Sequence, residues 1–423
     1  MKHNKRGRKR NYQRIGAMVF ALLIMYSLLI FLILYGDRLP FAGRVSFASA
    51  ETIDASGGPQ ANLAVNFNSE VGKIRQDFYG ANTHNFLLNG LKISVGNSIE
   101  NYSNTNWHRQ AWLDSGMGYM RWDMNLGGYY SNYLNGSINF TGNLNDKIER
   151  LKWAHENNIR TLIIADYMPT WLANFSMEGC NQIKLTDCMP SNISIWQAIV
   201  VDYLNRVTEN GTYASDIDVE VWNEPDMGSV LNGFVTDDPK KSVQYNQIYD
   251  ATYNAIKVGC PNISVGGPSL AVMSSDNMLR GFLSNFSQKM DFVSFHGYNS
   301  PSWKNTYDNV YSQIDLVLKN CSYYTSNCSR VIVSEFNVDH SNDDALMKNT
   351  ASRQNEFGMN IGSFYTSTLN NYPENVSMLL YQWSEEHSYS DNQNYPEYPQ
   401  RWSMVSEPQL DNAYYPSYNV TKN

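Results

Sequence analysis

Eight short apolar segments alternate with helical stretches along the chain, and this alternation restricts the possible folds more than any other feature of the sequence. Each segment favours a strand, ends in polar or aromatic residues, and begins a unit of roughly 30–55 residues. Strands and helices in alternation form right-handed βαβ units and a parallel sheet. The eight segments are DFYGANTH (77–84), MGYMRWDM (117–124), RTLIIADY (160–167), DIDVEVWN (216–223), NISVGGPS (262–269), DFVSFHGY (291–298), RVIVSEFN (330–337) and VSMLLYQW (376–383).

The number of units predicts an α/β fold, a closed (β/α)8 barrel of the TIM type, over residues 71–390. Helical patterns at 144–158 and 243–259 illustrate the connecting helices. A doubly wound open sheet is the alternative, but it would require a glycine-rich phosphate loop, and the sequence has no GxGxxG motif. Residues 391–423 are rich in Tyr, Pro, Asn and Ser, and we expect an irregular tail that packs on the barrel.

An uninterrupted apolar run at 15–35 contains no charged residue. As a helix it would span about 30 Å, the thickness of the hydrocarbon layer, whereas the apolar part of a cleaved signal has only ~7–15 residues. We therefore predict a single N-terminal transmembrane signal-anchor, with 1–14 as a basic cytoplasmic tail, 36–70 as a stalk, and the barrel outside the cell. Cleavage near Ala50 is the alternative and would give a secreted protein.

The charge balance argues against nucleic-acid binding by the barrel. The net charge is −8, and it falls to −15 without the seven basic residues of the N-terminal tail. The five cysteines lack the C-x-x-C spacing of zinc sites, so we expect no metal and no cofactor. The short segments between Cys180 and Cys188 and between Cys321 and Cys328 predict two local disulfides, with Cys260 as a buried thiol.

Abundant Asn-x-Ser/Thr sequons suit an extracellular glycoprotein. They begin at Asn101, Asn135, Asn139, Asn174, Asn192, Asn210, Asn262, Asn285, Asn320, Asn327, Asn375 and Asn419.

The residues that end the eight segments are the candidates for a functional site, because catalytic groups of such barrels lie at the C-terminal ends of the strands. Glu224 and Glu335 end the fourth and seventh segments, which face each other across the barrel mouth. Two carboxylates flanked by aromatic rings suit cleavage of a glycosidic bond, and Trp171 and Trp383 would offer flat faces to the sugar. The other segment ends supply Asn82, His84, Arg121, Asp123, Tyr167, Asn223, His296, Tyr298, Asn337 and Gln382.

Several motifs carry a resemblance to a known group of enzymes. WNEP at the end of the fourth segment and SEF at the end of the seventh resemble the paired glutamates of glycoside hydrolase clan A, whose members are retaining (β/α)8 enzymes. VWNEPD, VGGPS, DFVSFHGY and MPTWL resemble segments of family 39, the β-xylosidase and α-iduronidase group, in type and order. The resemblance covers residues ~75–385.

The resemblance implies a role for each matching residue. Glu224 becomes the acid/base and Glu335 the nucleophile, while Asn223 binds the sugar 2-hydroxyl. The remaining matches either lie beside the nucleophile (Arg121 and Tyr298) or line the sugar site (His296 and Trp383).

The expected function is a retaining glycoside hydrolase that acts on oligo- or polysaccharides by double displacement. The long loops after the third and fourth segments favour exo action, of the β-xylosidase or β-glycosidase kind. Two alternatives stay open: an endo-β-glycanase of the same clan, and a cell-surface barrel that binds glycans without cleaving them. The expected partners are a carbohydrate substrate and, through the N-terminal helix, the membrane.

Overall fold

The computed structural model describes residues between 74 and 383, all of which fall within the predicted barrel region of 71–390. The predicted tail, anchor and stalk (1–14, 15–35 and 36–70) and the C-terminal tail (391–423) lie outside the described residues, so they stay predictions. Among the helices that are described, none has both the length and the apolar character needed to cross a membrane. The described residues are 74–83, 92–95, 98–101, 105–177, 180–182, 185, 188–227, 239–271, 276–298, 303–324, 330–337, 351–381 and 383.

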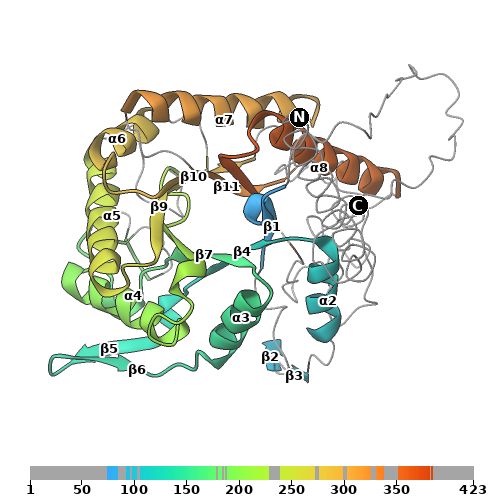
Figure 1. The fold of residues 1–423 in the computed structure, drawn as a ribbon. Helices are drawn as coiled ribbons and strands as arrows, with labels where there is room; N and C mark the ends of the chain where they lie inside the picture. Colours follow the sequence, from blue (N-terminus) through green and yellow to red (C-terminus); the bar gives the residue numbers. More distant parts are fainter. Residues whose placement is uncertain are drawn as a thin grey trace, which may run out of the picture. The chain divides into compact units, whose positions relative to one another are not determined.

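Eight parallel strands close into a barrel in the order β1-β12-β11-β10-β9-β8-β7-β4 (Figure 1). All eight predicted strands are confirmed. Barrel strands that are consecutive along the chain are also neighbours in the sheet, which is the topology of a (β/α)8 barrel. The strands are β1 (Tyr79–Asn82), β4 (Tyr119–Asp123), β7 (Arg160–Ala165), β8 (Ile217–Val221), β9 (Ser264–Leu270), β10 (Phe292–Gly297), β11 (Val331–Phe336) and β12 (Val376–Leu380).

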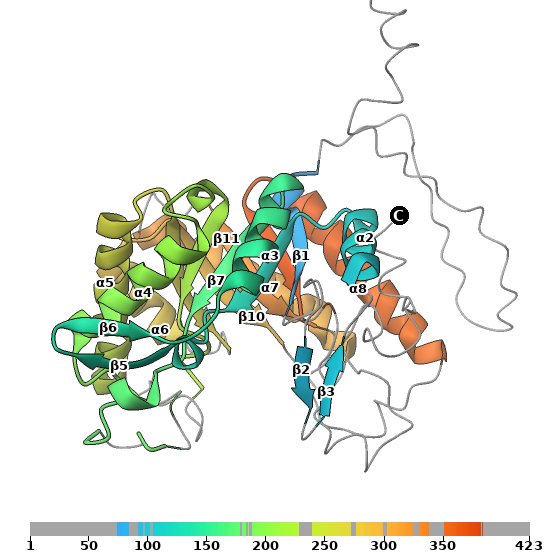
Figure 2. The ribbon, with the colours of Figure 1, turned by 90° about the horizontal axis from the view of Figure 1, so that it is seen from below.

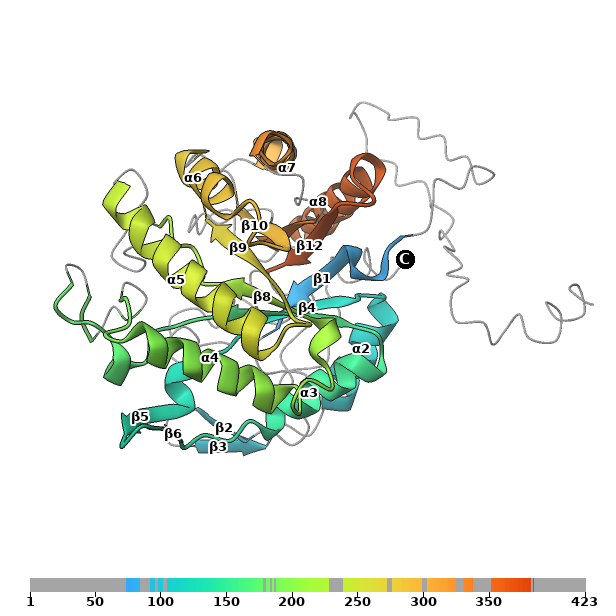
Figure 3. The ribbon, with the colours of Figure 1, turned by 60° about the vertical axis from the view of Figure 1, so that its left-hand side comes forward.

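Helices lie outside the ring of strands, as Figures 1 and 3 show. Each bears an apolar stripe, as α4 illustrates: the side chain of Asn192 caps its first turn, and the face that includes Trp196, Val200 and Tyr203 is buried. The predicted helices at 144–158 and 243–259 are confirmed as α3 and α5. The described helices are α2 (Thr105–Ser115), α3 (Asn145–Glu156), α4 (Ile193–Val207), α5 (Pro239–Gly259), α6 (Asp276–Phe286), α7 (Trp303–Tyr324) and α8 (Ala351–Asn371).

Two hairpins that the strand pattern did not predict lie along the chain between a barrel strand and the helix that follows it. One joins β2 (Lys92–Val95) to β3 (Ser98–Asn101), and the other joins β5 (Tyr130–Leu134) to β6 (Ser137–Phe140). The second hairpin lies beside α4 (Figure 2).

The barrel interior is built in layers. Near the N-terminal ends of the strands, a separate apolar cluster fills the centre, formed by Tyr119, Leu162, Phe292, Ile332 and Leu379. In the same part of the barrel, the buried carboxylate of Asp218 accepts hydrogen bonds from Tyr119 and from the guanidinium groups of Arg160 and Arg330. Side chains on a strand alternate between its two faces, so the residue two positions after Tyr119, Arg121, also points into the barrel, nearer the mouth.

The cysteine predictions hold where the structure describes them. Cys180 and Cys188 form a disulfide, and Cys260 is a buried thiol without a disulfide. Cys321 is also disulfide-bonded, and its predicted partner Cys328 lies outside the described residues. One sequon is a poor glycosylation site, because Asn320 is only 8% exposed and donates to a backbone carbonyl of its own helix.

Candidate active site

Glu224 and Glu335 are brought together at the C-terminal ends of their strands. Glu335 lies within β11, and the parallel register pairs it with His296 of β10. Glu224 follows β8, in a turn whose backbone N–H donates to the carbonyl of Ser269 in β9 at 3.0 Å. Each carboxylate is therefore held by the barrel itself, which fixes its position more firmly than a loop would.

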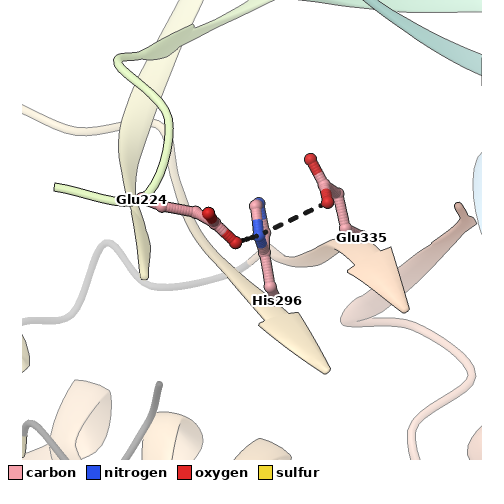
Figure 4. A group of neighbouring side chains, drawn as sticks. All are labelled: Glu224, His296 and Glu335. Atoms are coloured by element: carbon pink, nitrogen blue, oxygen red, sulfur yellow. Dashed lines mark hydrogen bonds and ion pairs between the residues drawn. The ribbon is translucent and has the colours of Figure 1, made fainter. Parts of the chain in front are cut away.

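His296 lies between the two carboxylates (Figure 4). Its Nδ1 is 2.8 Å from Glu224 Oε1 and 3.6 Å from Glu335 Oε2. The imidazole is fully buried, and burial lowers its pKa, but the negative charges of Glu335 and Glu224 outweigh this effect and raise the pKa above its ordinary value. One carboxylate oxygen of Glu224 lies within 4.8 Å of one of Glu335.

Arg121 of β4 is the centre of the hydrogen-bond network. Its Nη1 donates to Asn82 at 2.8 Å and to the carboxylate of Glu335, and its Nη2 donates to Asn223 at 2.8 Å. Nε and Nη2 both donate to one oxygen of Glu220, at 2.9 and 2.7 Å. Burial alone would lower the pKa of Arg121, but Glu220 and Glu335 raise it, so the guanidinium keeps its charge.

Tyr298 completes the surroundings of Glu335, since its hydroxyl donates to Oε2 at 2.9 Å. One oxygen of Glu335 is thus bound by a guanidinium and the other by a phenol. Both donors stabilise the ionised carboxylate, which is the form that a nucleophile requires.

A small pocket of about 100 Å³ opens beside Glu335. A site that buries a whole ligand has a volume of ~300–1,000 Å³, so this pocket is much smaller than such a site. Asn223 lies in the wall, between Arg121 and the hydroxyl of Tyr167, to which its amide donates at 3.2 Å. The full lining is Asn82, Thr83, Arg121, Trp122, Asp123, Tyr167, Asn223, Glu335 and Tyr381.

The two predicted tryptophan platforms lie elsewhere. Trp171 packs against the core and donates to the backbone carbonyl of Tyr130 at 2.6 Å. Trp383 is fully buried, with its ring 4.9 Å from that of Trp112. Neither lines the described pocket, whose aromatic side chains come from other positions, so a sugar-stacking role for either tryptophan stays a prediction.

Three residues of this region had no predicted role. The sequence places Asn82 at a strand end and assigns no role to it, to Glu220 or to Asp166. Burial and the negative charge of Asp123 raise the pKa of the fully buried Asp166 well above its ordinary value. A signal for Glu220 existed: it alternates with Asp218 on the inward face of a buried strand, and buried charges require partners.

Of the side chains that are described, Glu224, His296 and Glu335 place ligand atoms close enough together to hold a metal ion. The charge distribution fits this use poorly. The guanidinium of Arg121 already binds Glu335, and a cation between the carboxylates would lie close to that positive charge. The arrangement is better suited to proton transfer and nucleophilic attack by the carboxylates.

Comparison with known proteins agrees with this geometry. The family model described as Glycosyl hydrolases family 39 matches residues 103–338, more than half of the chain. A β-xylosidase from Geobacillus stearothermophilus is 30% identical over 169 residues, which are 38% of this chain and 31% of that enzyme. The match therefore spans less than a third of the relative's length.

Solved structures share the fold at low identity. A family 39 enzyme from Xanthomonas axonopodis pv. citri has a TM-score of 0.58 at 15% identity, covering 83% of this chain and 67% of the other. A broad-specificity endoglucanase of family 5 from Clostridium acetobutylicum has a TM-score of 0.55 at 11% identity, covering 83% of this chain and 100% of the other. At such identities the likeness shows the barrel fold alone.

Proposed function

The chain belongs to glycosyl hydrolases family 39, and from this membership together with the site we propose that it is a retaining β-glycosidase with Glu224 as acid/base and Glu335 as nucleophile. The substrate class that we propose is a β-xyloside or a related β-glycoside at the end of a glycan chain. The similarity to a β-xylosidase supports this choice. We also propose that the enzyme is anchored outside the cell, as its N-terminal sequence predicts.

The proposal depends most on the separation of the two carboxylates, whose nearest oxygens lie within 4.8 Å. Retaining glycosidases hold their carboxyl groups ~5–5.5 Å apart, whereas inverting enzymes hold them ~6.5–9.5 Å apart to admit a water molecule. The spacing here is closer to that of retaining enzymes, which supports direct attack on the sugar by the second carboxylate.

The proposed reaction proceeds in two steps. Glu335, ionised and oriented by Arg121 and Tyr298, attacks the anomeric carbon, while Glu224 gives its proton to the departing glycosidic oxygen. The bond to the aglycone breaks as the bond to Glu335 forms. In the second step Glu224 takes a proton from water, and the resulting hydroxide displaces Glu335, so the sugar is released with its original configuration.

Asn223 is placed to contact the substrate during these steps. The amide of Asn223 lines the pocket next to the nucleophile's guanidinium partner, a suitable place to bind the sugar 2-hydroxyl.

Hydrolysis of aryl glycosides by the full chain tests the proposal. Aryl β-xylosides, β-glucosides, β-galactosides and α-arabinosides, with polymeric xylan and glucan alongside, identify the sugar and separate exo from endo action. Proton NMR of the first product should show the substrate's anomeric configuration, and an inverted first product would contradict the role of Glu335. A barrel that binds glycans without cleaving them would turn over none of these substrates.

Two variants assign the carboxylates. Glu335→Ala should abolish turnover, and azide should restore it with an inverted glycosyl azide as product. Glu224→Ala should still react with aryl glycosides that have good leaving groups and accumulate the covalent intermediate. Glu156→Ala, on the exposed side of α3, is the matched control and should keep full activity.

A further inference from the structure

Ser269 of β9 is connected to the acid/base Glu224 directly through its backbone and indirectly through His296. Its backbone carbonyl accepts the N–H of Glu224 at 3.0 Å, and its Oγ lies 3.0 Å from Nε2 of His296, whose Nδ1 is 2.8 Å from Glu224 Oε1. Ser269 is fully buried and has a φ of 55°, a left-handed conformation that is unusual outside glycine. A serine hydroxyl held in such a conformation against a site histidine calls for a chemical explanation.

The neighbours of His296 favour one tautomer of its ring. Arg121 Nη2 lies 3.5 Å from Nε2, and a guanidinium can only donate, so it favours an Nε2 without a proton. The Ser269 hydroxyl can then donate to Nε2, which leaves the ring proton on Nδ1, facing Glu224. The positive charge of Arg121, which lowers the pKa of His296, lies on the Nε2 side of the ring and opposes a second proton there.

We propose that Ser269 is a positioning residue for the acid/base step: by donating to Nε2 it fixes the Nδ1–H tautomer of His296, which binds Glu224 Oε1 and keeps the catalytic proton on Oε2. This inference rests on the proposed function, because it concerns the group that protonates the leaving oxygen. The Nδ1–H donor remains in place in both steps, since Oε1 accepts whether or not Oε2 carries the proton. No proton has to pass through the histidine.

Loss of the Ser269 hydroxyl should misplace the acid proton. Without a donor to Nε2, the ring also populates the Nε2–H tautomer, whose unprotonated Nδ1 accepts the proton of Glu224 from Oε1. That proton is then on the wrong oxygen for the leaving group. Substrates that need acid assistance should suffer, and substrates with good leaving groups should not.

The experiment compares leaving groups in the full chain. Ser269→Ala and Ser269→Gly should each lower kcat/KM about tenfold for xylobiose, the size of one lost hydrogen bond, and leave 2,4-dinitrophenyl β-xyloside within about twofold. Glycine adopts positive φ without strain, so Ser269→Gly separates the hydroxyl from the backbone if Ser269→Ala folds poorly. Ser377→Ala is the control: it removes another buried hydroxyl, one that accepts from Arg75 near the opposite end of the barrel, and should not change the ratio of the two rates.

A second readout does not require activity. In protein labelled with ¹⁵N-histidine, the His296 ring should show an unprotonated Nε2 in the unmutated chain and a shift toward Nε2–H in both Ser269 variants, with the signal assigned through His296→Asn. Equal losses for both substrates, or an unchanged His296 spectrum in the variants, would overturn the proposal. If the unmutated chain hydrolyses no glycoside, the proposed function fails, while the spectrum still decides the tautomer.

Discussion

Replacement of Arg121 by methionine should destabilise the barrel and stop catalysis for two separate reasons. The side chain is 1% exposed and donates one hydrogen bond each to Asn82, Asn223 and Glu335 and two to Glu220. Methionine fills a similar volume but donates none of them. The fully buried Glu220 would then lack its cation, while Glu335 would keep the hydroxyl of Tyr298.

The expected size of the effect follows from burial. Removing one partner of a buried ion pair costs about 3–5 kcal/mol, because the remaining charge stays out of water without compensation. A second change, Glu220→Met, removes that charge and should recover most of the lost stability. It should not recover activity, because the guanidinium beside the nucleophile is still missing, and we expect kcat/KM to stay at least ~10²-fold down.

The pH dependence of the stability of Arg121→Met has a definite sign. In Arg121→Met, burial without a cation raises the folded-state pKa of Glu220 above its unfolded value of about 4.3. A carboxyl whose pKa is higher in the folded state than in the unfolded state stabilises the fold when it is protonated. Its full contribution to the free energy of unfolding is present below the unfolded-state pKa, and this contribution is lost as pH rises through the folded-state pKa. The stability gap between Arg121→Met and the double variant should therefore widen from pH 4 to pH 7.

Urea denaturation of the two variants and the unmutated chain at both pH values measures this gap. The reasoning is refuted if the double variant is no more stable than Arg121→Met at pH 7. It is also refuted if Arg121→Met retains more than about a tenth of the unmutated kcat/KM for an activated aryl glycoside.

Three further outcomes are expected. Arg330 and Arg160 hold the pKa of Asp218 below its ordinary value in spite of burial, so the ionised Asp218 stabilises the fold above about pH 4, and this contribution is lost as pH falls further. The substitution Asp218→Asn should lower the free energy of unfolding in urea at pH 7 by about 3–5 kcal/mol, and the stability of the variant should depend less on acid pH. Protease added to intact cells should remove the barrel and leave a membrane stub containing 15–35, unless the mature chain begins near Glu51. Non-reducing peptide mapping should join Cys180 to Cys188, and a peptide that links Cys260 to either would contradict the structure.

The barrel was predictable because several of its strands are apolar over most of both faces. Segments such as 160–167 and 330–337 are nearly continuous apolar runs with a polar end, as expected for parallel strands covered by helices outside and by a packed core inside. The hairpin of β5 and β6 also left a signal, since Asn135 and Gly136 both have positive φ and Asn-Gly is the preferred pair for such a turn. The dipeptide Asn135-Gly136 is therefore sufficient to predict this hairpin.

The parts of the site that escaped prediction depend on contacts between distant segments. A tryptophan at a strand end can present its face to a ligand or pack inward, and local sequence does not decide between these outcomes. Trp383, for example, packs against Trp112 and His108 of α2, which lie more than 270 residues away in the chain. Glu220 was overlooked for a related reason: its partner Arg121 lies 99 residues earlier.

The local backbone explains why a glutamate stands between an asparagine and a proline at the end of β8. Trp222 and Glu224 have φ values of 71° and 49°, which cost of order 1–3 kcal/mol each and persist only where the surroundings enforce them. The enforcement comes from the fully buried indole of Trp222, packed 6.0 Å from the rings of both Tyr167 and Trp196, and from the hydrogen bond between Glu224 N and the Ser269 carbonyl. This strained turn lets two successive side chains serve different partners, with Asn223 bound to Arg121 and Glu224 bound to His296. A regular strand would point consecutive side chains to opposite faces, so the strain is what brings the amide and the carboxyl into one site.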